Sequence, residues 1–117
     1  MAILSILVLG PAAVALGQAD YPAEMAKIVD QYPGATVLAA SSMEESLEVV
    51  LQTADQPQAV ADFYINALTG RGWKLESNVQ AGPAAALVFL KDEKTFDIGI
   101  ADQGQGQGSL VSLTLEK

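Results

Sequence analysis

Four side chains are the strongest candidates for contact with a ligand or a partner protein: Tyr64, Arg71, Trp73 and Phe96. Aromatic rings often line ligand pockets, so the three aromatic residues predict an apolar binding site. Tyr64 and Arg71 also carry polar atoms that could be free for recognition. Core packing is the simpler explanation of Trp73, because it lies on the apolar face of its predicted strand. The hydroxyl of Tyr64 needs water or a polar partner, which keeps both interpretations open.

The residue types that the chain lacks exclude most enzymatic chemistry. Its 117 residues include no Cys and no His. Disulfides, thiolate nucleophiles and zinc–thiolate sites need Cys, and His is the side chain best suited to proton transfer near neutral pH. Carboxylate, Lys, Tyr and Ser/Thr chemistry remains, but no motif singles out a residue for it. We therefore expect no catalytic residue, no cofactor and no metal site, in a protein that is not an enzyme.

Two local patterns resemble ligand-binding motifs and are better explained without a ligand. Glycine stands at every second position of the loop 104–108, as in phosphate-binding loops, but those loops precede a helix and a strand is predicted here. The acidic residues of segment 44–48 lack the alternating Asp, Asn and Gly of a calcium loop. We interpret the first as a flexible hairpin loop and the second as a solvated turn.

The charge balance argues against nucleic acid as a partner. The chain has 14 acidic and 6 basic residues, which gives a formal net charge of −8, and phosphate neutralisation needs clustered Lys and Arg. The bases are scattered along the sequence at Lys27, Arg71, Lys74, Lys91, Lys94 and Lys117. We expect no basic patch, and therefore neither anionic membrane surfaces nor acidic polymers as partners.

The segment 55–73 predicts a helix, its end and the strand that follows. Asp55 is the expected N-cap, and Gln58 is placed to complete a capping box. An apolar stripe follows at helical spacing, made of Val60, Phe63, Tyr64 and Leu68. Gly70 is placed to end the helix in the left-handed conformation. From Trp73 the apolar period changes to two, which indicates a half-buried strand.

The remaining segments complete an α+β domain. A first helix is expected over Tyr21–Tyr32, from its apolar spacing and the acidic residue before it. Apolar runs predict strands over Thr36–Ser41, Leu47–Thr53, Trp73–Gln80, Ala84–Leu90, Phe96–Ala101 and Val111–Glu116. Because short hairpins join consecutive strands, we expect a mostly antiparallel sheet of five to six strands. Both helices should lie on one face, in a two-layer fold of order α-β-β-α-β-β-β-β.

Residues 1–19 predict a targeting segment ahead of a single domain over 20–117. Residues 2–19 carry no charged side chain, Ile3–Leu9 is apolar, and small residues precede a possible cleavage site after Ala19. We interpret this segment as a signal peptide, which implies an exported protein in the periplasm or outside the cell. The alternatives are a retained membrane anchor and a core element of a cytoplasmic fold.

Four short motifs carry a family resemblance: Tyr32–Val37 at the entry of a strand, Thr53–Pro57 before a helix, Phe63-Tyr64 on that helix, and Gly72-Trp73 after it. Together they resemble small bacterial exported proteins and lipoproteins of unknown function. The resemblance covers about residues 21–117 and implies no catalytic residue. The chain differs from the lipoprotein members because it has no Cys at the leader junction, which argues against a lipid anchor.

The function expected from these observations is non-enzymatic binding of another protein or of a cell-envelope component. The alternative is a carrier of small apolar ligands, with a pocket between the helices and the sheet lined by Tyr64, Trp73 and Phe96. An enzyme based on carboxylate or Lys chemistry is the least favoured. In each case we expect contact with a membrane only through the N-terminal segment.

Overall fold

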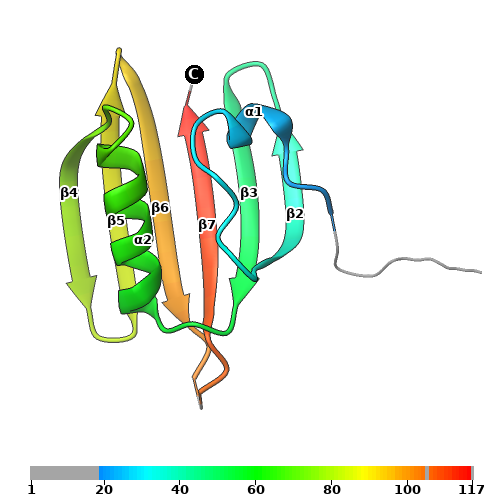
Figure 1. Cartoon of the computed structure of the whole chain (residues 1–117), viewed down its shortest axis with the longest axis vertical. Coiled ribbons are helices and arrows are strands. Elements are labelled where there is room, and N and C mark those ends of the chain that lie inside the picture. The colour runs from blue at the N-terminus through cyan, green and yellow to red at the C-terminus, as the bar shows by residue number, and fades with distance from the viewer. Residues whose placement is uncertain (1–18, 105, 117) are drawn as a thin grey trace, which may run out of the picture.

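The computed structural model describes residues 19–104 and 106–116, which form one antiparallel sheet of six strands and two helices (Figure 1). In chain order the elements are α1 (Ala23–Ala26), β2 (Thr36–Ser42), β3 (Ser46–Thr53), α2 (Pro57–Thr69), β4 (Lys74–Ala81), β5 (Ala84–Lys91), β6 (Lys94–Asp102) and β7 (Ser109–Glu116). The α+β class and the expected order of elements are confirmed. The predicted signal peptide or anchor lies, apart from its last residue, outside the described residues. Neither α1 nor α2 is long and apolar enough to cross a membrane.

The strands follow the spatial order β2-β3-β7-β6-β5-β4, and every neighbouring pair is antiparallel. Strands β4 to β7 form a meander, and β7 then pairs with β3 along its whole length. The last strand of the chain therefore lies inside the sheet, while α2 carries the chain from β3 to the far edge at β4. Figure 1 shows that this crossing lays α2 over β5 and β6.

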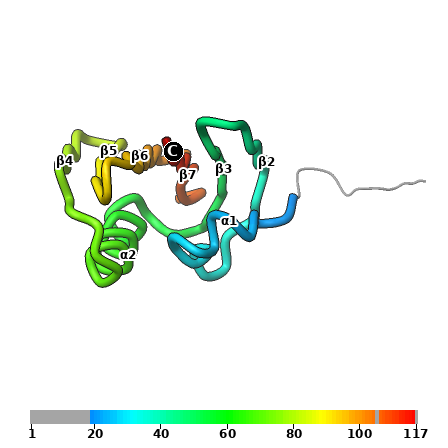
Figure 2. Tube along the Cα trace, turned by 90° about the horizontal axis from the view of Figure 1, so that it is seen from above, coloured from blue at the N-terminus to red at the C-terminus, as the bar shows by residue number. Residues whose placement is uncertain are grey.

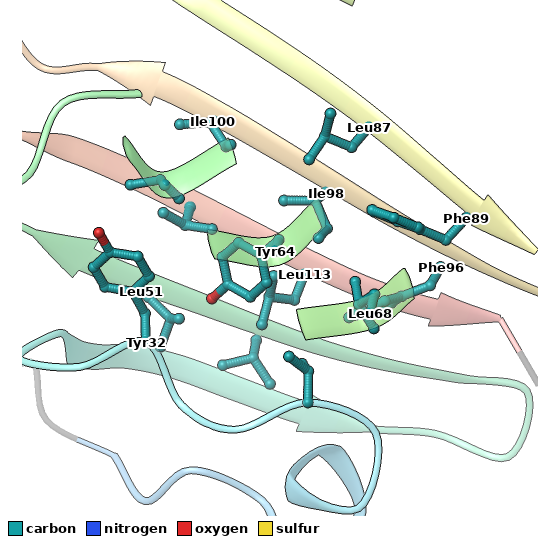
Figure 3. Packing of buried hydrophobic residues seen from close by; sticks show 14 of the residues in the cluster. Tyr32, Leu51, Tyr64, Leu68, Leu87, Phe89, Phe96, Ile98, Ile100 and Leu113 are labelled. Carbon is teal, nitrogen blue, oxygen red and sulfur yellow. The ribbon is translucent and has the colours of Figure 1, made fainter. Parts of the chain in front are cut away.

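The hydrophobic core lies on the side of the sheet where both helices are found (Figure 2). Alternate residues of β3, β5, β6 and β7 are buried there, as the period of two requires. Tyr64 and Leu68 of α2 pack over strand residues that include Phe96, Ile98 and Leu113 (Figure 3). Each large apolar side chain that is fully buried contributes about 1.5–3 kcal/mol, so these contacts hold α2 against the sheet.

The first helix is much shorter than predicted. It spans only Ala23–Ala26, whereas the apolar spacing indicated a helix over Tyr21–Tyr32. The amide of Val29 donates a hydrogen bond to the carbonyl of Met25, but the carbonyl of Val29 accepts one from the hydroxyl of Tyr21 at 2.9 Å. Met25 and Val29 are both fully buried. The spacing therefore reflects the burial of an irregular segment in the core and not a continuous helix.

The predicted N-cap residue of α2 is wrong. The N-cap residue is Gln56, without a side-chain hydrogen bond, instead of Asp55. The carboxylate of Asp55 accepts a hydrogen bond from the hydroxyl of Tyr32 at 2.6 Å, so a tertiary contact takes it from the helix. Gln58 donates to Asp62 inside the helix and closes no capping box. The Tyr32 contact links the first segment of the domain to the start of α2.

The predicted end of α2 is also displaced. Gly70 has right-handed backbone angles (φ −65°), and Gly72 takes the positive φ of 92°. The amide of Trp73 donates to the carbonyl of Leu68 at 3.0 Å, which closes the helix end. Within the helix, Phe63 is only half-buried, and its ring packs edge-to-face on the rings of Tyr32 and Tyr64. The turn that follows α2 brings Trp73 to the edge of the core.

Candidate functional site

A pocket with a volume of about 190 Å³ opens at the end of the sheet where α2 terminates. Its lining residues come from the end of α1 (Lys27 and Ile28), from the turn after α2 (Arg71 and Trp73) and from the β5–β6 turn (Lys91, Asp92 and Lys94). Figure 1 shows these three places at the same end of the sheet. We refer to this site as the basic pocket.

The basic pocket gathers most of the positive charge of the chain. Four of the six basic residues line it, and they are Lys27, Arg71, Lys91 and Lys94. Asp92 is the only acidic residue among the described residues that line it. The expectation of no basic patch is therefore wrong. The bases are distant in the sequence, but the fold brings together the end of α1, the end of α2 and the β5–β6 turn. The pattern of residues along the chain does not reveal this proximity.

Arg71 makes only a weak, exposed ion pair with another residue of the protein, Asp30. Its Nη2 atom lies 3.3 Å from an Oδ1 atom of Asp30, and the two side chains are 40% and 77% exposed. Ion pairs exposed to water in this way contribute little, because solvent screens them. A guanidinium has five N–H donors in a planar fork. Most of these donors remain available to a ligand in the pocket.

Lys91 has a structural partner. Its Nζ atom donates a hydrogen bond to the carbonyl oxygen of Arg71 at 2.8 Å. A Cβ atom built on Gly72 would lie 3.5 Å from that Nζ, so the lysine side chain runs along the glycine. A cation at this position satisfies a carbonyl and complements the negative end of the helix dipole. Lys91 therefore joins the β5–β6 turn to the end of α2.

Lys27 and Lys94 hold no partner of their own. Neither ammonium group makes a hydrogen bond or ion pair with residues 19–104 and 106–116. Lys27 is the C-cap residue of α1, and Lys94 is the first residue of β6. Both side chains are exposed. They are the free cations of the described part of the pocket.

The β5–β6 turn carries two local conflicts. Lys91 and Lys94 are paired directly across the two strands, and like charges in this position destabilise a sheet. Between them, Asp92 and Glu93 adopt φ values of 52° and 68°. A two-residue turn of this kind favours Asn or Asp followed by Gly, so Asp92 suits its position, whereas Glu93 stands where Gly is preferred. The sequence thus places unfavourable residues where the pocket is formed.

The four residues predicted from the sequence separate into two pairs. Arg71 and Trp73 both line the basic pocket, where the indole of Trp73 is 6% exposed. Phe96 and Tyr64 are fully buried in the core, and neither lines the pocket. The centroids of the Phe96 and Trp73 rings lie 5.8 Å apart, so Phe96 packs against Trp73 from the core side and supports this wall of the pocket.

The tyrosines of the core are poor proton donors and acceptors near neutral pH. Burial raises the pKa of Tyr64 well above its ordinary value, and the hydroxyl makes no hydrogen bond to the described residues. Burial, with the hydrogen bond to Asp55 and its charge, raises the pKa of Tyr32 to about 12. Both therefore stay protonated at neutral pH, as packing residues would.

Sequence reasoning missed three lysines of the pocket. Lys91 and Lys94 flank a two-residue turn, so the alternation of β5 and β6 could have placed them opposite each other. Nothing in the sequence indicates that Lys27 and Arg71 approach that turn. Their proximity depends on the path of α2 over the sheet and on the early end of α1.

A second hollow, of about 420 Å³, has a different character. It is lined by Val50, Ala84, Ala85, Gly99, Ile100, Ala101, Leu110, Val111 and Ser112. Its exposed members, such as Gly99 and Ala101, alternate along β6 with residues that are buried under α2. This apolar hollow therefore lies on the open face of the sheet and not between the helices and the sheet. Among the described residues, no group of three or more acidic side chains is placed to hold a metal ion.

A family model described as START domain-like matches residues 29–108, which is more than half of the chain. The chain belongs to the START domain-like family. The part of this START domain-like protein that matches contains α2, strands β2 to β6 and every residue of the basic pocket except Lys27 and Ile28. Neither the curated proteins nor the solved structures gave a match to the chain. Family membership is compatible with a ligand-binding module.

Proposed function

We propose that this protein is a non-enzymatic binding module whose ligand carries negative charge and enters the basic pocket. The observation that carries the proposal is the convergence of four of the six bases on one site in a chain of net charge −8. Mutual repulsion opposes such a gathering unless an anion offsets it. Membership of the START domain-like family is compatible with this role.

The walls of the pocket favour a ligand with an apolar part beside its anionic group. Trp73 and Ile28 supply apolar surface, and the planar fork of Arg71 matches a carboxylate or a phosphate. Such a ligand is either a small molecule or an acidic group displayed by a cell-envelope component. Export of the protein is part of the proposal, and the uncharged segment 2–19 and the resemblance to small exported proteins support it.

The composition of the pocket favours binding over catalysis. Its described lining residues offer cations and hydrogen-bond donors, with Asp92 as their one carboxylate and with no Ser, Thr or Tyr among them. A catalytic site needs a nucleophile or a base held in position by a third group. Among the described lining residues, only the lysines and Asp92 belong to the usual nucleophile types, and no hydrogen bond joins any of them to a base.

Fluorescence of Trp73 tests the proposal directly, because it is the only Trp of the chain and lies in the pocket. Aromatic carboxylates and phosphates should change its emission, and their neutral amides should not. Lys94→Glu should abolish the response, while Lys74→Glu, an identical change at an exposed residue of β4 outside the pocket, should keep it. Equal responses to anions and to neutral analogues, or equal losses in the two variants, would overturn the proposal.

The second candidate function is that of a carrier of small apolar ligands, and the 420 Å³ hollow on the open sheet face favours it. Gly99 lies in this hollow, and a Cβ atom built on it would meet only the Cβ of Ser112, at 4.0 Å. Gly99→Val should therefore fill the hollow without disturbing the fold, and it should abolish binding of an apolar dye. Dye binding that persists in Gly99→Val and disappears in Lys94→Glu would exclude the hollow as the site.

A further inference from the structure

We infer that the anionic group taken by the basic pocket is a phosphoryl group with two negative charges. This inference rests on the proposed function and narrows it to one class of ligand. Lys27, Lys94 and Arg71 would hold the phosphoryl oxygens. Lys91 is a positioning residue, because its ammonium group is already bonded to the carbonyl of Arg71 at 2.8 Å.

The charge of the lining favours a group with two negative charges. Four bases and one acid line the pocket, so three positive charges are left uncompensated within the lining. A carboxylate would neutralise one of them. A phosphate monoester carries about 1.5 to 2 negative charges at neutral pH and three acceptor oxygens. Of these two anions, only the phosphate monoester matches both the excess positive charge and the number of hydrogen-bond donors in the pocket.

The free hydrogen-bond donors of the pocket also favour a phosphoryl group. Lys27 and Lys94 have no partner in residues 19–104 and 106–116. Arg71 spends one nitrogen on the largely exposed Asp30, at 3.3 Å. Two ammonium groups and a guanidinium fork therefore point to a tetrahedral group with several acceptor atoms, since a planar carboxylate has only two oxygens.

The β5–β6 turn contains residues that lower the stability of its hairpin. Lys91 and Lys94 face each other across the hairpin, and Asp92 and Glu93 hold positive φ angles. Residues that break local rules in this way cluster at functional sites, where a bound group offsets the cost. An anion beside both lysines removes their repulsion. The like-charge pair of Lys91 and Lys94 is thus explained by a bound anion better than by the hairpin alone.

The size of the pocket suits a small headgroup. The pocket has a volume of about 190 Å³, below the roughly 300 to 1,000 Å³ of pockets that enclose a drug-sized molecule. It suits a headgroup whose remaining atoms extend past Trp73 and Ile28 into solvent or into a lipid layer. The phosphoryl group therefore belongs either to a soluble phosphate monoester or to the headgroup of a phosphatidic acid type of lipid.

The experiment is a calorimetric titration of the full chain with glycerol phosphate, with acetate as the carboxylate reference. Glycerol phosphate should bind about 10-fold or more tightly than acetate, and its binding should strengthen as the pH rises through about 6, where the second proton leaves. The double variant Lys27→Met/Lys94→Met should lose about 10-fold or more in affinity, and Lys74→Met should retain it. Circular dichroism of both variants checks that they are folded.

A parallel sedimentation assay distinguishes the two sources of the phosphoryl group. Vesicles of phosphatidylcholine that contain phosphatidic acid should capture the protein if the source is a lipid headgroup, and the lysine double variant should not be captured. Capture by these vesicles without binding of glycerol phosphate would identify the lipid headgroup as the ligand. Binding of glycerol phosphate without capture by the vesicles would identify a soluble monoester. If vesicles with phosphatidylglycerol, a singly charged diester, capture the protein equally well, the doubly charged group is excluded.

The outcomes also separate this inference from the proposed function. Binding of acetate that depends on Lys94, without a preference for glycerol phosphate, would overturn the phosphoryl assignment and leave the anionic pocket intact. No binding of any anion would overturn both. Binding of phosphate that the lysine double variant retains would place the ligand elsewhere and would also contradict both.

Discussion

The Nζ atom of Lys91 donates a hydrogen bond to the carbonyl oxygen of Arg71 at 2.8 Å. This contact ties the hairpin of β5 and β6 to the C-terminus of α2, two elements that are separated by the whole of β4. Because both residues line the basic pocket, the same bond fixes two of its walls. The relative position of these two walls therefore depends on a hydrogen bond between two turns at the surface.

Replacing Lys91 by Met should lower the free energy of unfolding by about 0.5–1 kcal/mol, since the carbonyl of Arg71 loses its donor and the helix end loses its cation. Lys94→Met, which removes an ammonium group without a partner, should stay within about 0.5 kcal/mol of the wild type. Urea denaturation measures both. Equal losses in the two variants would show that the Lys91 bond contributes nothing specific.

Replacing Glu93 by Gly should raise the free energy of unfolding by about 1 kcal/mol. Glu93 holds a φ of 68°, which costs an L-residue about 1–2 kcal/mol and costs glycine almost nothing. Glu76→Gly, the same change at an exposed strand position, should instead lower stability by about 0.5–1 kcal/mol. Thermal unfolding compares the two, and a loss of stability in Glu93→Gly would contradict the strain.

Gly108 should be the least tolerant glycine of the loop before β7. Its φ is 89°, and an added Cβ would collide with the carbonyl of Thr53 and the backbone of Ala54. Gly108→Ala should therefore cost about 2–4 kcal/mol, from strain and overpacking together. Gly106 has a φ of 73° and open space around it, so Gly106→Ala should cost only about 1–2 kcal/mol. Denaturant midpoints that agree for the two variants would rule out the close contact.

Trp73→Ala should cost about 3–5 kcal/mol, because the buried indole leaves a cavity beside Phe96. Phe63→Ala should cost less, since Phe63 is only half-buried. Val79→Ala is the matched control, because Val79 is 56% exposed near the end of β4 and should change stability by less than about 0.5 kcal/mol. A stable Trp73→Ala variant that no longer binds its ligand would show that the indole serves recognition more than packing.

Stability should fall at alkaline pH. The pKa of Tyr32 is raised to about 12 in the folded chain, and burial raises the pKa of Tyr21 and Tyr64 as well. The pKa of Tyr in the unfolded chain is about 10. Between about pH 10 and about pH 12 the folded state therefore binds more protons than the unfolded state, and its stability decreases as the pH rises. The contribution is complete below about pH 10 and is lost as the pH rises through about 12. Urea midpoints measured across this range should decline, and constant midpoints would contradict the raised values.

Much of the fold could be predicted from the sequence, because apolar periodicity is a local signal. The strands β3, β5, β6 and β7 alternate or run apolar in the sequence as they do in the sheet. The prediction was wrong where a tertiary contact overrides the local signal. The carboxylate of Asp55 accepts a hydrogen bond from Tyr32 and therefore does not cap α2. Met25 and Val29 are buried in the core although no continuous helix connects them.

The candidate site was less predictable for the same reason. Trp73 and Arg71 were identified because they lie on the segment with the clearest pattern. Lys27 reaches them only because α1 ends after one turn, and Lys94 reaches them only because α2 ends beside the β5–β6 turn. The joining of three chain segments at one end of the sheet is a property of the fold, and no spacing in the sequence expresses it.

The most direct test of the basic pocket as the binding site is an NMR titration of the full chain with glycerol phosphate, followed by amide and indole chemical shifts. The largest shifts should occur at the indole of Trp73, the amide of Gly72 and the amides of the β5–β6 turn. Residues of the open sheet face, such as Gly99 and Leu110, should not move. Shifts that are largest at Gly99 and Leu110, with those of Trp73 unchanged, would contradict the assignment.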